Sequence, residues 1–167
     1  MPRRKGISPV IATVIIVAVT IAVAIAVAFW MTGIVGLFTG FEQLQIVNVY
    51  DEQNDGIYVT VKNTGTSAAS ITDIYINGYS YTQYSSDVTV TYGKDANSAT
   101  NTFTPSAGIP LKPGEQQVIK ITCKAGATLS LFKIEPGVSL EIKLHSAGGK
   151  DYPKVFVPQL YSCSSGS

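Results

Sequence analysis

His145 is the only histidine in the chain, and imidazole is the side chain best suited to general acid–base catalysis near neutral pH. It ends a predicted strand that also contains Glu141. Four residues of strand separate these side chains by about 13 Å, which is too far for a shared metal ion. A serine nucleophile would need an oriented base, and His145 is the only candidate. No glycine-rich phosphate loop follows a strand and opens a helix. We therefore expect no catalysis, no bound metal and no cofactor.

Cys123 and Cys163 are the only cysteines and are the second pair of residues with potential chemistry. If they lie outside the cytoplasm, a disulfide between them can persist. It would close a loop of about 40 residues and stabilise the fold by about 2–4 kcal/mol. The alternative is two free thiols, one buried on a strand and one in the polar tail from Ser162 to Ser167. The sequence favours the disulfide and leaves the alternative open.

These residues follow a long segment without any charged side chain, from Gly6 to Phe41. Its most apolar part, Val10 to Met31, meets the length of about 20 residues that a helix needs to cross a bilayer core of about 30 Å. From Val10 to Val27 every residue is β-branched or alanine, so intrinsic propensity alone would not select a helix. A lone strand in lipid would leave its backbone groups unpaired, whereas a helix pairs them internally. We therefore expect a membrane-spanning helix.

The sequence defines the start of this helix better than its end. Ser8 can act as the N-cap, and Pro9 can occupy the first helical position, where its missing N–H costs nothing. The helix can end at Gly33, Gly36 or Gly40.

The charged residues are distributed asymmetrically around the apolar segment. Arg3, Arg4 and Lys5 precede it, and by the positive-inside rule they stay cytoplasmic while the chain beyond the helix lies outside. Without them, nine lysines against eleven acidic residues give a net charge of −2, so we expect no nucleic-acid partner. An ordinary secretory signal peptide, cleaved near residues 24–28, is the alternative for this segment. The apolar run, however, continues through residues 29–31 without the polar break that such a site needs.

Small residues recur along the helix at a spacing of four, which predicts helix–helix packing. Such rows let helix backbones approach closely, because packing drives association among apolar helices. The alternative is that alanine and glycine are simply common in membrane helices. The rows alone do not distinguish this alternative from helix–helix packing. One row consists of Thr20, Ala24, Ala28, Thr32, Gly36 and Gly40, and a neighbouring row of Ala18, Ala22 and Ala26.

After Gly40 the pattern changes to short alternating runs that predict about eight strands with turns every 8–12 residues. The Asn77-Gly78 pair is a strong hairpin signal, because both turn positions must tolerate a positive φ. Residues 93–105 are rich in Asn, Ser and Thr and predict an exposed loop. The pattern indicates an immunoglobulin-like antiparallel β-sandwich after the helix, an α+β chain. The predicted strands are Leu44–Tyr50, Gly56–Lys62, Ser70–Ile76, Tyr79–Tyr84, Asp87–Tyr92, Gln116–Cys123, Val138–His145 and Tyr152–Val157.

The start of the chain is similar to a known family of surface proteins. Arg3-Arg4-Lys5-Gly6, followed by the run from Ile7 to Ile15, resembles the class III signal sequence and N-terminal helix of archaeal type IV pilins. This resemblance, which covers the chain up to Gly40, implies cleavage between Gly6 and Ile7 by a membrane-embedded prepilin peptidase. The cut would remove the cytoplasmic positive charges, Arg3, Arg4 and Lys5, which hinder extraction of the helix from the membrane.

The resemblance also implies an organisation and a function. Residues 1–6 would be the leader, 7–40 the hydrophobic helix and 41–167 an extracellular β-sandwich. The helices of many copies would bundle into the core of a helical filament on the cell surface. The expected partners are further copies of the chain, the peptidase, a pilus assembly ATPase, a membrane platform protein, and the cytoplasmic membrane before assembly. Two alternatives remain: an archaellin of a motility filament, and a monomeric membrane-anchored binding module.

Overall fold

The computed structural model describes residues 8–38, 40–125, 127 and 129–163. The chain divides into two compact units, Met1–Gly40 and Phe41–Ser167. The residues of the predicted cleavage site, Arg3, Arg4, Lys5, Gly6 and Ile7, lie outside the described residues.

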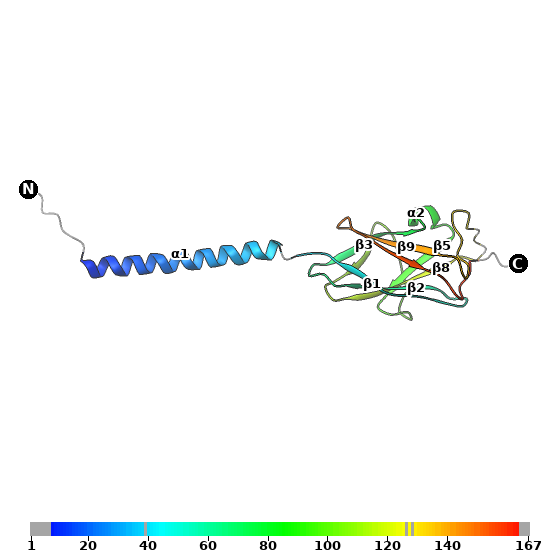
Figure 1. Cartoon of the computed structure of the whole chain (residues 1–167), viewed down its shortest axis with the longest axis horizontal. Helices are drawn as coiled ribbons and strands as arrows, with labels where there is room; N and C mark the ends of the chain where they lie inside the picture. Colours follow the sequence, from blue (N-terminus) through cyan, green and yellow to red (C-terminus); the bar gives the residue numbers. More distant parts are fainter. Residues whose placement is uncertain (1–7, 39, 126, 128, 164–167) are drawn as a thin grey trace, which may run out of the picture. The chain divides into compact units, whose positions relative to one another are not determined.

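The first unit contains one long helix, α1 (Pro9–Phe38), which Figure 1 shows as uninterrupted. It begins as the sequence predicts: the carbonyl of Ser8 accepts hydrogen bonds from the N–H groups of Ile11 (3.0 Å) and Ala12 (3.2 Å), with Pro9 in the first helical position. The β-branched residues thus form a helix against their intrinsic preference. The helix continues through Gly33 and Gly36, two of its predicted ends, and ends at Phe38.

The second unit is built from short strands joined by turns (Figure 1). Its described elements are β1 (Leu44–Glu52), β2 (Gly56–Asn63), β3 (Ala69–Ile76), β4 (Tyr79–Ser80), α2 (Tyr81–Tyr84), β5 (Val88–Gly93), β6 (Asn101–Thr102), β7 (Ile109–Leu111), β8 (Gln116–Cys123), β9 (Leu140–Ser146) and β10 (Asp151–Phe156).

The strands form two antiparallel sheets. One has the order β1-β2-β8-β5-β6, and the other has the order β10-β9-β3-β4, with β7 paired to β3. Buried apolar side chains of both sheets join one core, so the sheets pack face to face as in a sandwich. The predicted fold class, an apolar helix followed by an antiparallel β-sandwich, is confirmed. The core includes Ile57, Val59, Val61, Ile119 and Ile121 of the first sheet, and Ile71, Ile74, Ile142 and Leu144 of the second.

The prediction of a strand over Tyr79–Tyr84 is wrong beyond Ser80, where the chain turns into α2. The backbone N–H of Ser80 donates to the side chain of Gln83 (3.1 Å), an arrangement typical of a helix N-terminus. The buried hydroxyl of Tyr84 donates to the carbonyl of Ile74 (2.7 Å). The Ser80-x-x-Gln83 spacing was therefore a helix signal within a segment that alternates like a strand.

The prediction of an exposed loop over residues 93–105 is also wrong in part. The segment contains β6, and Phe103 is buried in the core with its ring centroid 5.0 Å from that of Tyr81. The polar composition of the segment obscured its one large apolar side chain. The Asn77-Gly78 turn, by contrast, is confirmed, with φ angles of 49° and 86°.

The start of the β unit is attached to the turn between β2 and β3. The carbonyl of Phe41 accepts a hydrogen bond from the N–H of Ser67 (3.1 Å), and the carbonyl of Gln43 accepts one from Thr64 (2.8 Å). A Cβ atom at Gly65 would lie 2.4 Å from the Phe41 carbonyl oxygen, so only glycine allows this approach. Residues 41–43 are therefore part of the folded unit.

The C-terminal segment is attached to the opposite end of β1 by a carboxylate. One oxygen of Asp51 accepts hydrogen bonds from the backbone N–H groups of Gln159 (2.9 Å), Leu160 and Tyr161 (2.7 Å). Partial burial tends to raise the pKa of Asp51, but these hydrogen bonds favour the charged form and lower the pKa below its ordinary value. The ionised carboxylate thus connects the C-terminal segment to the first sheet.

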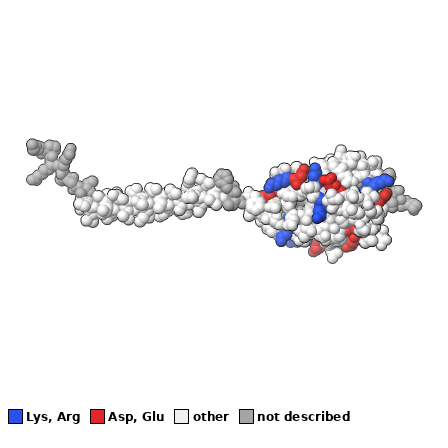
Figure 2. All heavy atoms as spheres, in the orientation of Figure 1, with Lys and Arg blue, Asp and Glu red and all other residues white. Residues whose placement is uncertain are grey.

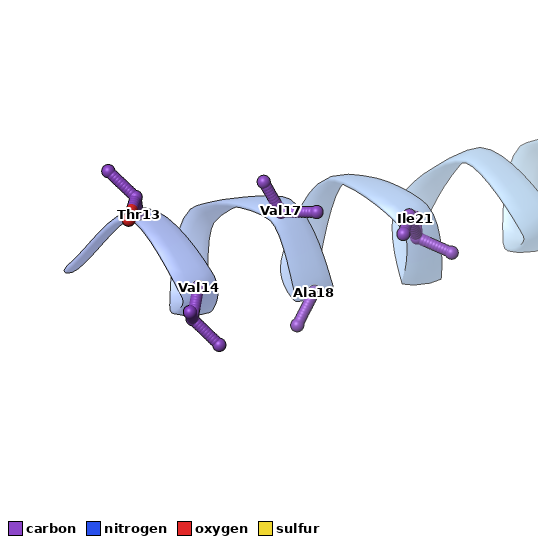
Figure 3. A pocket seen from close by; sticks show the side chains of 5 residues that line it. All are labelled: Thr13, Val14, Val17, Ala18 and Ile21. Atoms are coloured by element: carbon purple, nitrogen blue, oxygen red, sulfur yellow. The ribbon is translucent and has the colours of Figure 1, made fainter. Parts of the chain in front are cut away.

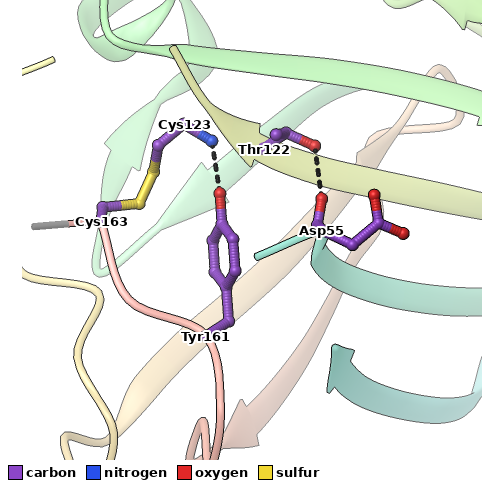
Figure 4. The surroundings of a disulfide bond; sticks show 5 residues. All are labelled: Asp55, Thr122, Cys123, Tyr161 and Cys163. Atoms are coloured by element: carbon purple, nitrogen blue, oxygen red, sulfur yellow. Dashed lines mark hydrogen bonds between the residues drawn. A yellow bond between two sulfur atoms is a disulfide. The ribbon is translucent and has the colours of Figure 1, made fainter. Parts of the chain in front are cut away.

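A disulfide joins the same segment to β8. Cys123 and Cys163 are bonded, with their Cα atoms 5.8 Å apart, and the hydroxyl of the buried Tyr161 accepts a hydrogen bond from the Cys123 N–H (2.7 Å) (Figure 4). The N–H of Cys163 also donates to the carbonyl of Ile134 (2.8 Å). Burial raises the pKa of Tyr161, because lost hydration disfavours the phenolate. The C-terminal segment is therefore held by both a covalent bond and hydrogen bonds.

We predict that Cys163→Ser lowers the free energy of unfolding by about 2–4 kcal/mol, because the unfolded chain is no longer cross-linked. Denaturant unfolding of the full chain in detergent, followed by tyrosine fluorescence, measures the change. The double variant Cys123→Ser/Cys163→Ser and the reduced wild type serve as controls and should unfold like the single variant. Equal stability of the oxidised and reduced wild type would contradict the prediction.

We predict that Asp51→Asn destabilises the β unit by about 1–3 kcal/mol at neutral pH, because charged hydrogen-bond acceptors are lost. The folded-state pKa of Asp51 lies below the unfolded value, so its carboxylate stabilises the fold above a pH of about 4. That contribution disappears as the pH falls through the lower folded-state pKa. The difference in unfolding free energy between the variant and the wild type should then fall to zero. Glu52→Gln, at an exposed neighbour, is the control. A difference in unfolding free energy that does not change with pH would refute a role for the charged carboxylate of Asp51.

Candidate assembly surface

Helix α1 exposes apolar side chains around its whole circumference. No residue in the window Pro9–Val35 is buried, the mean hydropathy reaches 3.1, and Phe29 and Trp30 are 75% and 68% exposed. Figure 2 shows no Lys, Arg, Asp or Glu on this helix. Among the described residues, it is the one helix long and apolar enough to cross a membrane. The surface therefore requires an apolar partner, either lipid or protein.

The β unit does not need this helix to complete its core. Its two sheets bury their apolar side chains against each other, and the core cluster contains no residue of α1. Burying a valine or isoleucine side chain contributes about 1.5–3 kcal/mol relative to exposure in water. Exposure of the bare helix to water is therefore strongly unfavourable, and the partner must come from outside the monomer.

The hydroxyl groups of α1 are satisfied within the helix. Thr13 donates to the carbonyl of Val10 (2.8 Å), Thr20 to Ile16 (2.7 Å) and Thr32 to Ala28 (3.0 Å). A hydroxyl with a backbone partner costs much less to place in an apolar medium than one without. Threonine is therefore compatible with a helix surrounded by lipid or by other helices.

Two hollows lie on the surface of α1, each beside a small residue. The first is lined by Val14, Val17, Ala18 and Ile21, together with Thr13, and Figure 3 shows these side chains along the helix. The second is lined by Ile25, Ala28, Phe29 and Thr32. The second set repeats the first four positions after eleven residues. Since eleven residues make about three helical turns, both hollows open on the same side of the helix.

The hollows define a seam with alternating spacings of four and three residues. This spacing stays on one helix face and is typical of helices that pack side by side with a left-handed crossing. A spacing of four alone drifts by about 40° per step, so the predicted rows wind around the helix. Of the predicted packing residues, Ala18, Ala28 and Thr32 lie on the seam, and Thr20, Ala22, Ala24 and Ala26 lie beside it or away from it. The seam consists of Val14, Ala18, Ile21, Ile25, Ala28 and Thr32.

His145 has a carboxylate partner that the sequence analysis did not find. Its Nδ1 lies 2.6 Å from Asp151 on β10, whereas the carboxylate considered from the sequence was Glu141 on the same strand. The hydrogen bond to His145 is the main cause that lowers the pKa of Asp151. The predicted second strand began at Tyr152, so the sequence prediction left Asp151, which lies opposite His145, outside both strands.

The side chains around His145 and Asp151 contact one another across neighbouring strands. The Tyr75 ring on β3 meets the His145 ring edge-on at 6.4 Å, and Lys143 lies 4.6 Å above the Tyr75 ring. These residues link three neighbouring strands on the outer side of their sheet. Within the described residues, no group of three or more His, Cys, Asp or Glu side chains could hold a metal ion.

The charged side chains of the β unit are mixed in sign. Figure 2 shows Lys and Asp or Glu residues close to one another on the face in view. Elsewhere in the β unit, Lys120 of β8 pairs with Asp55 in the turn between β1 and β2, which also accepts a hydrogen bond from Tyr58. The hydrogen bond from Lys120 is the main cause that lowers the pKa of Asp55. Nothing on this face forms a basic stripe of the kind that follows a nucleic-acid backbone.

We predict that Ala18→Phe and Ala28→Phe each weaken self-association of the full chain in lipid bilayers about tenfold. The added ring fills a hollow and keeps the backbones of neighbouring helices apart. Energy transfer between labelled copies at increasing dilution in lipid measures the association. Val23→Phe is the control, because Val23 is five residues from both alanines and rotated by about 140° from each. An equal loss with Val23→Phe would mean that no face is preferred.

No family model matches the sequence, and no curated protein matches it. Among solved structures, the archaellum periplasmic stator protein FlaG from Sulfolobus acidocaldarius is similar over 70% of this chain and 100% of that chain, with 17% identity and a TM-score of 0.37. A lipoprotein from Bacteroides thetaiotaomicron is similar over 74% of this chain and 82% of that chain, with 11% identity and a TM-score of 0.33. Similarities as weak as these carry no argument about function.

Proposed function

We propose that this chain is a structural subunit of an archaeal type IV pilus, an adhesive filament on the cell surface. In this proposal, α1 is inserted in the cytoplasmic membrane until assembly and then packs among the helices of identical subunits. The β unit covers the outside of the filament and meets other surfaces. The role is architectural, without catalysis or a cofactor.

One observation carries the proposal: a 30-residue helix that is apolar on every side adjoins a β unit whose core is complete without it. A single membrane anchor would need only about 20 of these residues. The seam of α1, with its two hollows, adds a surface suited to a second helix of the same kind. The resemblance of residues 3–15 to archaeal type IV pilins gives this surface a specific use.

Release from the membrane requires energy in this scheme. Lipid already shelters the valine and isoleucine side chains of α1, so moving them into a filament gains little from the hydrophobic effect. The gain comes from closer packing against other helices. We therefore propose that a pilus assembly ATPase, acting through a membrane platform protein, drives the transfer, as the resemblance to pilins implies.

Processing of the leader gives the most direct test. When the chain is produced in an archaeon that has a prepilin peptidase, the surface form should begin at Ile7, and sheared material should contain filaments in electron micrographs. Both follow from cleavage after Gly6 and release of the helix from its positive charges. N-terminal sequencing and microscopy of the same preparation provide the two measurements.

A variant and a matched control sharpen this test. Gly6→Val should leave the leader in place and abolish the filaments, because the helix then keeps Arg3, Arg4 and Lys5 at the cytoplasmic surface. Gly33→Val, a similar change within α1, should still be cleaved, since a Cβ at Gly33 meets nothing within 4 Å in the monomer. If the wild type remains in the membrane as a monomer that begins at Met1 or Pro2, the chain is a simple anchor and the proposal is wrong.

A further inference from the structure

We propose that α1 occupies one defined depth in the bilayer, with Trp30 in the headgroup interface at the C-terminal side of the hydrocarbon core. Val10 then lies at the opposite interface, and Val19 and Thr20 lie near the midplane. The partner of this surface is a phospholipid bilayer. The inference concerns the membrane-inserted chain and holds whether or not the chain later enters a filament.

The length of the helix allows more than one depth. The described window Pro9–Val35 has 27 residues, several more than the hydrocarbon core requires. From Val10 to Trp30 the helix rises by about 30 Å, which equals the thickness of that core. The side chains must therefore determine which depth the helix occupies.

Polar groups select the segment from Val10 to Trp30. Ser8 precedes this segment, and Thr32 and Gly33 follow it. Within it, the only polar side chains are Thr13 and Thr20, and both hydroxyls donate to carbonyls of the preceding turn. Between Val10 and Phe29 the segment therefore presents no unsatisfied side-chain polar group to lipid.

Trp30 itself indicates which residue lies at the interface. It is the only tryptophan in the chain, and the residue is 68% exposed on the helix. In the described part of the chain its indole N–H has no hydrogen-bond partner. Placing that N–H in hydrocarbon would cost free energy, whereas at the headgroup level it can bond to water or to lipid oxygen atoms while the ring stays in an apolar layer.

Moving the helix by one turn in either direction is unfavourable. A shift that buries four more residues at the C-terminal end would draw the indole N–H of Trp30 and the backbone of Gly33 into the hydrocarbon. The opposite shift would bring the hydroxyl of Ser8 into the hydrocarbon and move Phe29 and Trp30 toward water. The proposed depth avoids both penalties.

The proposed depth also places the end of the helix. Residues 31–38 rise by about 12 Å beyond Trp30, through the headgroup layer. Gly33, whose backbone lacks the cover of a side chain, then lies where water or headgroups can reach it. The end of the helix is therefore outside the hydrocarbon.

The single tryptophan allows a direct measurement of depth. The purified full chain is reconstituted into phosphatidylcholine vesicles that carry bromine on the acyl chains, either near the headgroup or near the terminal methyl group. Tryptophan fluorescence should be quenched more strongly by the shallow bromines than by the deep ones. Circular dichroism checks that α1 is helical in each sample.

A second variant provides a matched control for depth. The Val19→Trp/Trp30→Phe variant moves the only tryptophan to the predicted midplane, and the deep bromines should quench its fluorescence more strongly. Stronger quenching of wild-type Trp30 by the deep bromines would overturn the proposed depth. So would equal quenching patterns in both proteins, or quenching of Trp30 only by aqueous iodide. Filament formation plays no part in this measurement, so its outcome is separate from the test of the pilus proposal.

Discussion

The structure depends on one constraint: helix α1 has apolar side chains on all sides and must be surrounded by an apolar medium. A soluble monomer cannot provide this medium, because the β unit fills its own core from its own two sheets. The remaining choices are lipid and other helices, and the helix suits both. Its threonine hydroxyls bond to its own backbone, so neither surrounding has to supply hydrogen bonds to them. The proposed depth of Trp30 and the seam of α1 are two consequences of this constraint, one for each surrounding.

The sequence was sufficient for the features that depend on local chemistry or on composition. Ser8 and Pro9 define the start of α1, and Asn77-Gly78 defines a turn that needs two positive φ angles. The apolar run predicted a helix against the preference of its β-branched residues, since no other structure pairs the backbone in lipid. The α+β fold class followed from the change of pattern after Gly40.

Features that depend on contacts between distant residues were harder to predict. The segment after Ser80 alternates like a strand, and hydrogen bonds from its backbone to the side chains of Asp73 and Gln83 stabilise the start of the short helix. Phe103 lies in a polar run, and its burial depends on the space beside Tyr81. The His145–Asp151 contact depends on the register between β9 and β10, and the predicted second strand began one residue after Asp151. The hydrogen bonds of Asp51 to residues 159–161 required the path of a segment with no regular structure.

The β unit has features that suit a unit tethered through its first strand. β1 lies at one edge of its sheet and, among the described strands, pairs with β2 alone, so a load that enters at Phe41 would act on an edge strand. Hydrogen bonds from the β2–β3 turn hold residues 41 and 43 before that strand begins, and Asp51 ties its far end to the C-terminal segment. The Cys123–Cys163 disulfide then connects that segment to β8, two strands into the sheet. Separating β1 from the fold therefore requires breaking contacts at both of its ends, which is a stronger arrangement than an edge strand held by one partner alone.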